Sequence, residues 1–238
     1  MKTQIGFCLM KWVFLLLSLG FVEGLFAIDS AKPISANFAE ISYINTVLIN
    51  PLESIELSDV SEIASFRDNF SFFLVFVFNG VFKLNSELSV VSSAFAGQDE
   101  IGARLGINKV IDHHGKSYTA IIPSVKYIDG SRYDSSDYTN KMTYISKGGE
   151  LKVLHSVVVR STIYTGSVGA NVDYCTISYN GADYGTSIIK HGEVGISTKS
   201  EYYRFFCLIG LSAKITEAKN KNDFRILPYI SYQIGVNL

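Results

Sequence analysis

The sequence predicts an all-β fold, an antiparallel barrel of about ten strands with a range of roughly eight to twelve. Segments of alternating apolar and polar residues recur between turn residues, and helical periodicity is hard to find. Several segments run well beyond the about five or six residues that are average for strands. Strands of about 9–11 residues cross a bilayer when they are tilted, so the predicted barrel is a transmembrane β-barrel.

The composition excludes two classes of protein. The 238 residues are 47% apolar and 13% aromatic, which rules out extended disorder because so many rings need burial. The net charge of −1 leaves no basic excess for binding a nucleic acid. Only 18% of the residues are charged, below the roughly 25% of soluble domains, so apolar side chains are expected outside as well as inside.

The first 27 residues have the parts of a secretory signal peptide. Lys2 and Lys11 supply positive charge, and an apolar run of eleven residues, 12–22, follows them. This run is shorter than the about 20 residues that a spanning helix needs. Gly24 and Ala27 then offer small residues for a signal peptidase. We expect residues 1–27 to be removed on export; a retained N-terminal anchor helix is the alternative.

The expected organisation is a segment of uncertain role, 28–69, followed by a barrel, 70–238. Within the first segment, residues 38–49 read as one further strand and residues 51–68 as an acidic connector. Asn79-Gly80 lies between two apolar runs and predicts a tight hairpin. The ten predicted strands of the barrel span residues 70–78, 81–94, 101–111, 118–128, 141–147, 151–165, 170–180, 187–199, 202–216 and 226–238.

The last predicted strand shows the alternation most clearly. One face carries Ile230, Tyr232, Ile234, Val236 and Leu238, and the other face carries Ser231, Gln233, Gly235 and Asn237. A strand that is apolar outside and polar inside, placed at the end of the chain, can close a barrel against an earlier strand. Closure gives every backbone donor a partner, as a lipid environment requires.

With the signal peptide, the segment Pro228 to Leu238 resembles the C-terminal strand of Gram-negative outer-membrane β-barrel proteins. Apolar residues at alternate positions, counted back from the end, are typical of that class. Leu238 departs from it, because the final residue there is usually aromatic, commonly Phe. The resemblance implies location in the bacterial outer membrane and insertion by the barrel-assembly machinery, which reads this strand.

Two features favour a different class, a secreted or fimbrial β-sandwich acting as a structural or adhesion subunit. Pro123 falls within a predicted strand, where it removes a hydrogen-bond donor and would call for a bulge in a closed barrel. Residues 151–165 alternate poorly, because Lys152 and Arg160 share a face with Leu154 and Val158. This strand also suits a sheet buried on both faces.

The sequence predicts no catalytic, cofactor-binding or metal-binding residues, and we expect no enzyme and no cofactor. Asp112, His113 and His114 lie in a predicted turn and read as a solvated loop rather than a metal site. His155 and Ser156 are strand neighbours that point to opposite faces, so they cannot act as base and nucleophile. His191 and Glu193 share a strand face, but two residues alone establish neither a metal nor a reaction.

Six charged residues fall on faces assigned to the interior, and paired across a narrow lumen they would block conduction; a small conductive pore is the alternative. They are Glu87, Arg104, Lys126, Arg160, Glu193 and Lys214. We expect a non-enzymatic surface protein whose partners are the lipid bilayer and a host or extracellular ligand, not a nucleic acid. Residues 129–140 form its longest predicted loop. Whether Cys175 and Cys207 pair stays open.

Overall fold

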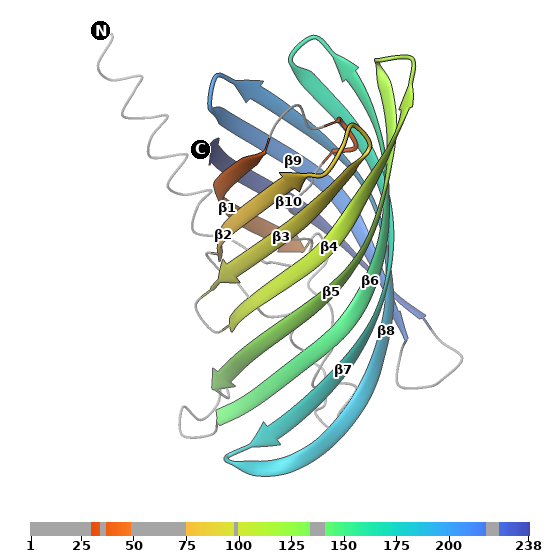
Figure 1. Cartoon of the computed structure of the whole chain (residues 1–238). Helices are drawn as coiled ribbons and strands as arrows, with labels where there is room; N and C mark the ends of the chain where they lie inside the picture. Colours follow the sequence, from red (N-terminus) through yellow and green to blue (C-terminus); the bar gives the residue numbers. More distant parts are fainter. Residues whose placement is uncertain (1–29, 34–36, 49–74, 98–99, 134–140, 218–223) are drawn as a thin grey trace, which may run out of the picture.

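The computed structural model describes residues 30–33, 37–48, 75–97, 100–133, 141–217 and 224–238, and within them ten strands close into one antiparallel barrel (Figure 1). The strands are β1 (Phe38–Leu48), β2 (Val75–Lys83), β3 (Leu88–Ala96), β4 (Glu100–His113), β5 (Ser117–Tyr133), β6 (Lys141–Val159), β7 (Thr162–Tyr179), β8 (Ala182–Tyr202), β9 (Phe205–Glu217) and β10 (Phe224–Asn237). The predicted all-β antiparallel barrel is confirmed. A single closed sheet replaces the two packed sheets of the sandwich alternative, which is wrong for the described residues.

Each strand pairs with its neighbours in the chain, and β1 pairs with β10 to close the barrel. In this last pair Glu40 lies opposite Asn237 and Leu48 lies opposite Tyr229. The C-terminal strand therefore closes the sheet, as its alternation predicts. Because β1 lies within residues 28–69, the barrel begins earlier than the predicted boundary at residue 70.

Asn79 and Gly80 do not form the predicted hairpin; they lie inside β2, and residues 84–87 make the turn. Asn79 is fully buried, and its side-chain nitrogen donates a hydrogen bond to Glu40 Oε1 at 2.6 Å. A Cβ built on Gly80 would lie 2.9 Å from Ser92 Oγ, so this glycine serves a close contact between strands. Tertiary contacts therefore hold this dipeptide in a strand, although Asn-Gly by itself favours a turn.

The gaps between the predicted strands 141–147, 151–165 and 170–180 are also strand, at residues 148–150 and 166–169. They lie in β6 and β7, so the predicted strands 141–147 and 151–165 are wrong as separate elements. The turn between β6 and β7 falls instead at residues 160–161, where Arg160 has a φ of 57°. The gap between the predicted strands 170–180 and 187–199 contracts to the turn Asn180-Gly181, whose φ values are 50° and 82°.

Pro123 sits in β5 without a bulge. The β4–β5 pairing runs from Glu100 opposite Gly130 to Gly106 opposite Ser124, and it resumes in the same register at Lys109 opposite Ile121. The interruption removes the ladder position facing the proline, which lacks an N–H donor. On its other side Pro123 pairs normally with Leu151 of β6.

The two ends of the barrel differ. One end, here called the short-turn end, carries both barrel termini and the turns at 84–87, 114–116, 160–161 and 203–204. At the opposite end, the loop end, β1, β3, β5 and β9 end at gaps in the described ranges, and the tight turn 180–181 joins β7 to β8. Strands β6 to β8 have 19, 18 and 21 residues against 9 in β2 and β3, so the wall is taller on their side (Figure 1). Of the predicted loop 129–140, residues 129–133 continue β5 and the rest lie outside the described residues.

Candidate functional site: the interior and the outer wall of the barrel

The interior of the barrel contains two clusters of buried apolar side chains. The loop-end cluster consists of Ile44, Val75, Val77, Phe95, Ile128, Tyr144, Cys175 and Ile177. The short-turn cluster consists of Ala31, Val81, Val91, Val110, Tyr118, Ala120, Ile122 and Leu154. Each cluster draws on at least four strands, so apolar side chains meet across the barrel near both of its ends.

A polar layer separates the two clusters. Along β5, Lys126 and Ser124 stand between Ile128 of the first cluster and Ile122 of the second. Ion pairs lie in this interior, among them Arg104 Nη2 with Glu150 Oε2 at 3.2 Å, Lys126 Nζ with Asp173 Oδ2 at 2.7 Å, and Lys199 Nζ with Glu40 Oε2 at 3.8 Å. Buried charges are tolerated because they are paired, and removing one partner leaves an expensive buried charge.

Four of the six charges predicted to point inward do so. Arg104, Lys126 and Lys214 are largely buried, and Glu193 lines an interior cavity. The prediction is wrong for Glu87 and Arg160, which lie exposed in turns at the short-turn end. Sequence reasoning missed the interior acids and lysines that follow. They are Glu40, Glu150, Lys152, Asp173 and Lys199. When the glycines of β6 and β7 are read as strand residues, the alternation of period two places several of these charges on the inner face.

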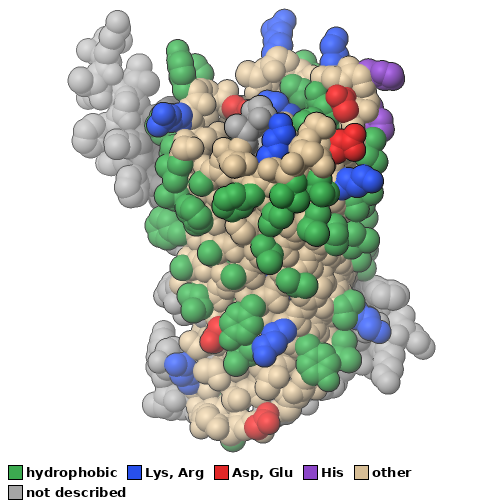
Figure 2. Space-filling model, viewed as in Figure 1, with side chains coloured by type: hydrophobic (Ala, Val, Ile, Leu, Met, Phe, Trp, Pro, Cys, Tyr) green, Lys and Arg blue, Asp and Glu red, His purple; other side chains and the backbone are tan. Residues whose placement is uncertain are grey.

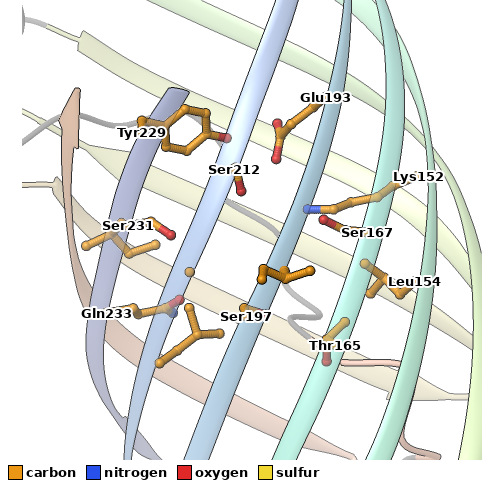
Figure 3. A pocket seen from close by; sticks show the side chains of 14 residues that line it. Lys152, Leu154, Thr165, Ser167, Glu193, Ser197, Ser212, Tyr229, Ser231 and Gln233 are labelled. Carbon is orange, nitrogen blue, oxygen red and sulfur yellow. The ribbon is translucent and has the colours of Figure 1, made fainter. Parts of the chain in front are cut away.

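One interior cavity of about 60 Å³ lies beside β6 to β10 (Figure 3). Small hydroxyl side chains line much of it, together with Lys152, Glu193, Tyr229 and Gln233. At about 10–15 Å³ for each water position, it holds roughly four to six water molecules. It is a polar pocket inside the wall, far smaller than the roughly 300–1,000 Å³ typical of small-molecule sites.

Residues 30–33 lie inside the barrel at the short-turn end. Ala31 is fully buried in the short-turn cluster, and its backbone N–H donates a hydrogen bond to Ser156 Oγ at 2.8 Å. Ser156 Oγ in turn lies 2.8 Å from Thr165 Oγ1. Lys32 Nζ reaches Glu201 Oε2 at 3.7 Å, and both of these side chains remain partly exposed. This short stretch occupies space that would otherwise belong to the lumen.

The outer wall is apolar over most of its height. Figure 2 shows hydrophobic side chains around the middle of one face and charged ones toward its two ends. Along β4 the two faces alternate, since Ile101 is 60% exposed, Leu105 is 55% exposed and Asn108 is fully buried. An outward apolar surface of this extent is unusual for a soluble monomer.

Aromatic side chains mark the edges of this apolar band. On β7, Tyr164 and Tyr174 both point outward and are about half exposed. Ten residues at about 3.3 Å each separate them by about 33 Å along the strand. With a strand tilt of about 40°, the height along the axis is about 25 Å, which matches the apolar band of outer-membrane barrels. Near the Tyr174 edge, Lys147 Nζ lies 5.9 Å from the centre of the Tyr127 ring.

The histidines separate as the sequence predicts. His155 points outward while Ser156 is fully buried inside, so the two do not face one another. His191 is interior and lies 2.7 Å from Asn171 Nδ2 through its Nε2. His114 lies exposed in the turn before β5 with a φ of 65°. Within the described ranges, no three His, Cys, Asp or Glu side chains are placed to hold a metal ion.

The two cysteines of the barrel point to opposite faces. Cys175 belongs to the loop-end cluster, and Cys207 of β9 alternates with the inward-facing Phe206 and Leu208. They form no disulfide with each other. The described residues contain no helix that is long and apolar enough to cross a membrane.

Comparisons with known proteins agree only in overall shape. No protein-family model and no curated protein matches the sequence. The translocator domain of the autotransporter NalP from Neisseria meningitidis is similar with a TM-score of 0.49 and 9% identity, over 84% of this chain and 86% of that one. The protease OmpT from Escherichia coli gives 0.39 and 6%, over 86% and 92%. Ail of Yersinia pestis gives 0.32 and 11%, over 85% and 97%.

Proposed function

We propose that this chain is a non-enzymatic surface protein of a bacterial outer membrane, held in the bilayer as a β-barrel. The outer wall carries the proposal: large apolar side chains face outward over about 25 Å of height, between outward tyrosines at each edge. In water these apolar side chains would be unfavourably exposed to solvent. In a bilayer the hydrocarbon chains of the lipids cover them. Every strand has two hydrogen-bonded neighbours, which a bilayer also requires.

The asymmetry of the ends supports an orientation. Outer-membrane barrels have short turns on the periplasmic side and longer loops outside. The short-turn end, with both barrel termini, then faces the periplasm, and the loop end faces the environment. Beyond Tyr174 the outer face gains exposed polar side chains, Thr176, Thr186 and Lys141, beside the exposed Ile145. The β7–β8 hairpin and its neighbours would stand above the bilayer, where a host or another extracellular ligand can touch them.

A closed interior is part of this proposal. Apolar clusters near both ends, ion pairs between them and residues 30–33 at the short-turn end fill much of the interior, and the cavity beside β6 to β10 measures about 60 Å³. A minor pore is the second candidate, favoured by the serines and charged groups around that cavity. Current recorded across a planar bilayer separates them: the closed barrel gives no discrete steps, whereas a pore gives steps of constant size.

The two ends of the sequence support proposals for how the chain is exported and inserted in the membrane. We propose that residues 1–27 direct secretion and are cleaved, and that the barrel-assembly machinery binds β10. Sequencing the N-terminus of the protein from an outer-membrane fraction tests the first point. A Val236→Asp variant tests the second, because it places a charge on the outward face of the terminal strand. It should accumulate in the periplasm, and normal insertion would contradict this role of β10.

The membrane location itself is tested by fractionation and gel mobility. The protein should sediment with outer membranes, float with lipid in a density gradient and migrate differently before and after boiling. Release into a periplasmic extract without detergent, with one mobility on gels, would overturn the proposal. Hydrolysis of peptides or lipids by the purified barrel, lost on His155→Ala, would overturn its non-enzymatic part.

A further inference from the structure

An apolar groove crosses the outer wall over β6 to β10. Its volume is about 770 Å³, and its lining is almost entirely apolar. Gly166 lines it, and a Cβ built on this glycine would meet no heavy atom within 4 Å. The missing side chain therefore creates part of the hollow. The other groove residues used below are Val153, His155, Ile196 and Leu211.

A polar cluster adjoins one end of this groove. His155 belongs to both, since it lines the groove and its ring nitrogens contact two hydroxyl groups. His155 Nε2 lies 3.1 Å from Ser117 Oγ, and His155 Nδ1 lies 3.0 Å from Thr119 Oγ1. His113 Nε2 is 3.0 Å from the same threonine oxygen, and the two imidazole rings are 6.1 Å apart. The four side chains, here called the histidine cluster, are outward-facing polar groups near the short-turn edge of the apolar band.

The register places cluster and groove along one line. Thr119 lies opposite His155, His155 opposite Gly166, Gly166 opposite Ile196, and Ile196 opposite Leu211. The line moves away from the short-turn end as it proceeds. Thr119 is three residues from the 114–116 turn, whereas Leu211 is seven residues from the 203–204 turn. It thus begins near one edge of the apolar band and continues toward its middle.

We propose that this surface binds one phospholipid of the leaflet at the short-turn end, with its phosphate at the histidine cluster and an acyl chain in the groove. The inference rests on the proposed membrane location. Imidazole and hydroxyl groups donate hydrogen bonds to phosphate oxygens, and such bonds to an ion are stronger than neutral ones. Lys109 and Lys116, both exposed near the same turn, add positive charge. The line from Thr119 to Leu211 has the polarity of a lipid: its polar end lies at the edge of the apolar band, and its apolar end lies toward the middle of the band.

Each part of the site has a separate physical role. Hydrocarbon surrounds the whole wall, so the groove gains no hydrophobic energy over bulk lipid and contributes only by close packing. Selection for a phosphate must therefore come from the histidine cluster. Two variants follow. Gly166→Leu fills the groove and leaves the cluster in place, and His155→Ala removes the shared ring and leaves the groove open. Gly149→Leu is the matched control, because Gly149 is an exposed β6 glycine with the nearest heavy atom 4.0 Å from a built Cβ.

The experiment is native mass spectrometry of the full chain from mild detergent, titrated with phosphatidylglycerol and with diacylglycerol of the same chains. The unaltered protein should retain one phosphatidylglycerol and bind diacylglycerol about fivefold or more weakly. Gly166→Leu should weaken both by about fivefold, and His155→Ala should remove the preference between them. Gly149→Leu should behave as the unaltered protein does. Heat-modifiable mobility of every variant shows that the barrel has folded.

Three outcomes would overturn the phospholipid site. Equal binding of the two lipids excludes phosphate recognition, and equal retention in Gly166→Leu and Gly149→Leu excludes the groove. A dimer that only Gly166→Leu abolishes would assign the surface to a second copy of the chain. These outcomes differ from failure of the membrane proposal, since in that case the protein would not float with lipid at all.

Discussion

Lys126 of β5 and Asp173 of β7 pair at 2.7 Å across an intervening strand, at the point where β6 has Gly148. Gly148 lies opposite both residues, and a Cβ built on it would overlap the Asp173 carboxylate. The two charged side chains thus meet over a backbone position that only glycine leaves clear. Both are largely buried, so the pair depends on this clearance.

Gly148→Ala should destabilise the barrel by about 2–4 kcal/mol, because the added methyl group displaces a buried carboxylate from its partner. Urea unfolding in lipid vesicles, followed by circular dichroism, measures this change. Gly149→Ala is the control, since the neighbouring glycine is exposed and a Cβ built on it would lie 4.0 Å from the nearest heavy atom. Equal effects of the two substitutions would show that general strand propensity, and not the ion pair, sets the cost.

The Lys126–Asp173 pair should show strong coupling in a double-mutant cycle. Lys126→Met and Asp173→Leu should each cost about 3–5 kcal/mol, because each leaves one buried charge unpaired. The double variant should cost much less than the sum of the single ones. Lys147→Met serves as the comparison and should cost less than about 1 kcal/mol, because this lysine is exposed beside Tyr127. Additive single effects would contradict a buried, mutually dependent pair.

The cost of an outward-facing charge should depend on its height along the wall. Leu151→Arg, at a position half exposed within the apolar band, should destabilise the barrel in vesicles by about 2–4 kcal/mol. Thr176→Arg lies beyond the Tyr174 edge and should change stability by less than about 1 kcal/mol. Unfolding free energies in vesicles provide the measurement. In a water-soluble barrel both exposed sites would accept arginine equally well, and that result counts against the bilayer.

The hydrogen bond from Ala31 to Ser156 should hold residues 30–33 inside the barrel. Ser156→Ala should raise the hydrogen-exchange rate of the Ala31 amide by about fivefold, as expected for the loss of about 1 kcal/mol. Ser167 lines the interior cavity instead, so Ser167→Ala should leave the exchange rate of the Ala31 amide unchanged. Mass spectrometry of exchanged peptides reports both rates. An unchanged rate in Ser156→Ala would mean that packing in the short-turn cluster alone retains the segment.

Local sequence preference misled the prediction at glycines that serve contacts between strands. Gly80 and Gly148 each sit where a neighbouring side chain needs space, so the strand continues through a dipeptide that resembles a turn. Two predicted strands merge in β6 for this reason. The predicted strand at 38–49 joins the sheet because β10 and β2 both offer it a hydrogen-bonding edge. Local sequence pattern does not show that these edges are available.

The sequence by itself determined the fold class and the outward face of the strands, because both depend on an alternation of period two that neighbouring residues display directly. It also placed Arg104, Lys126, Glu193 and Lys214 on the inner face. Only the tertiary structure decided which charges meet, that residues 30–33 enter the lumen, and that His113 lies beside His155. These relationships depend on strand register, which joins residues far apart in the chain, and no local pattern records it.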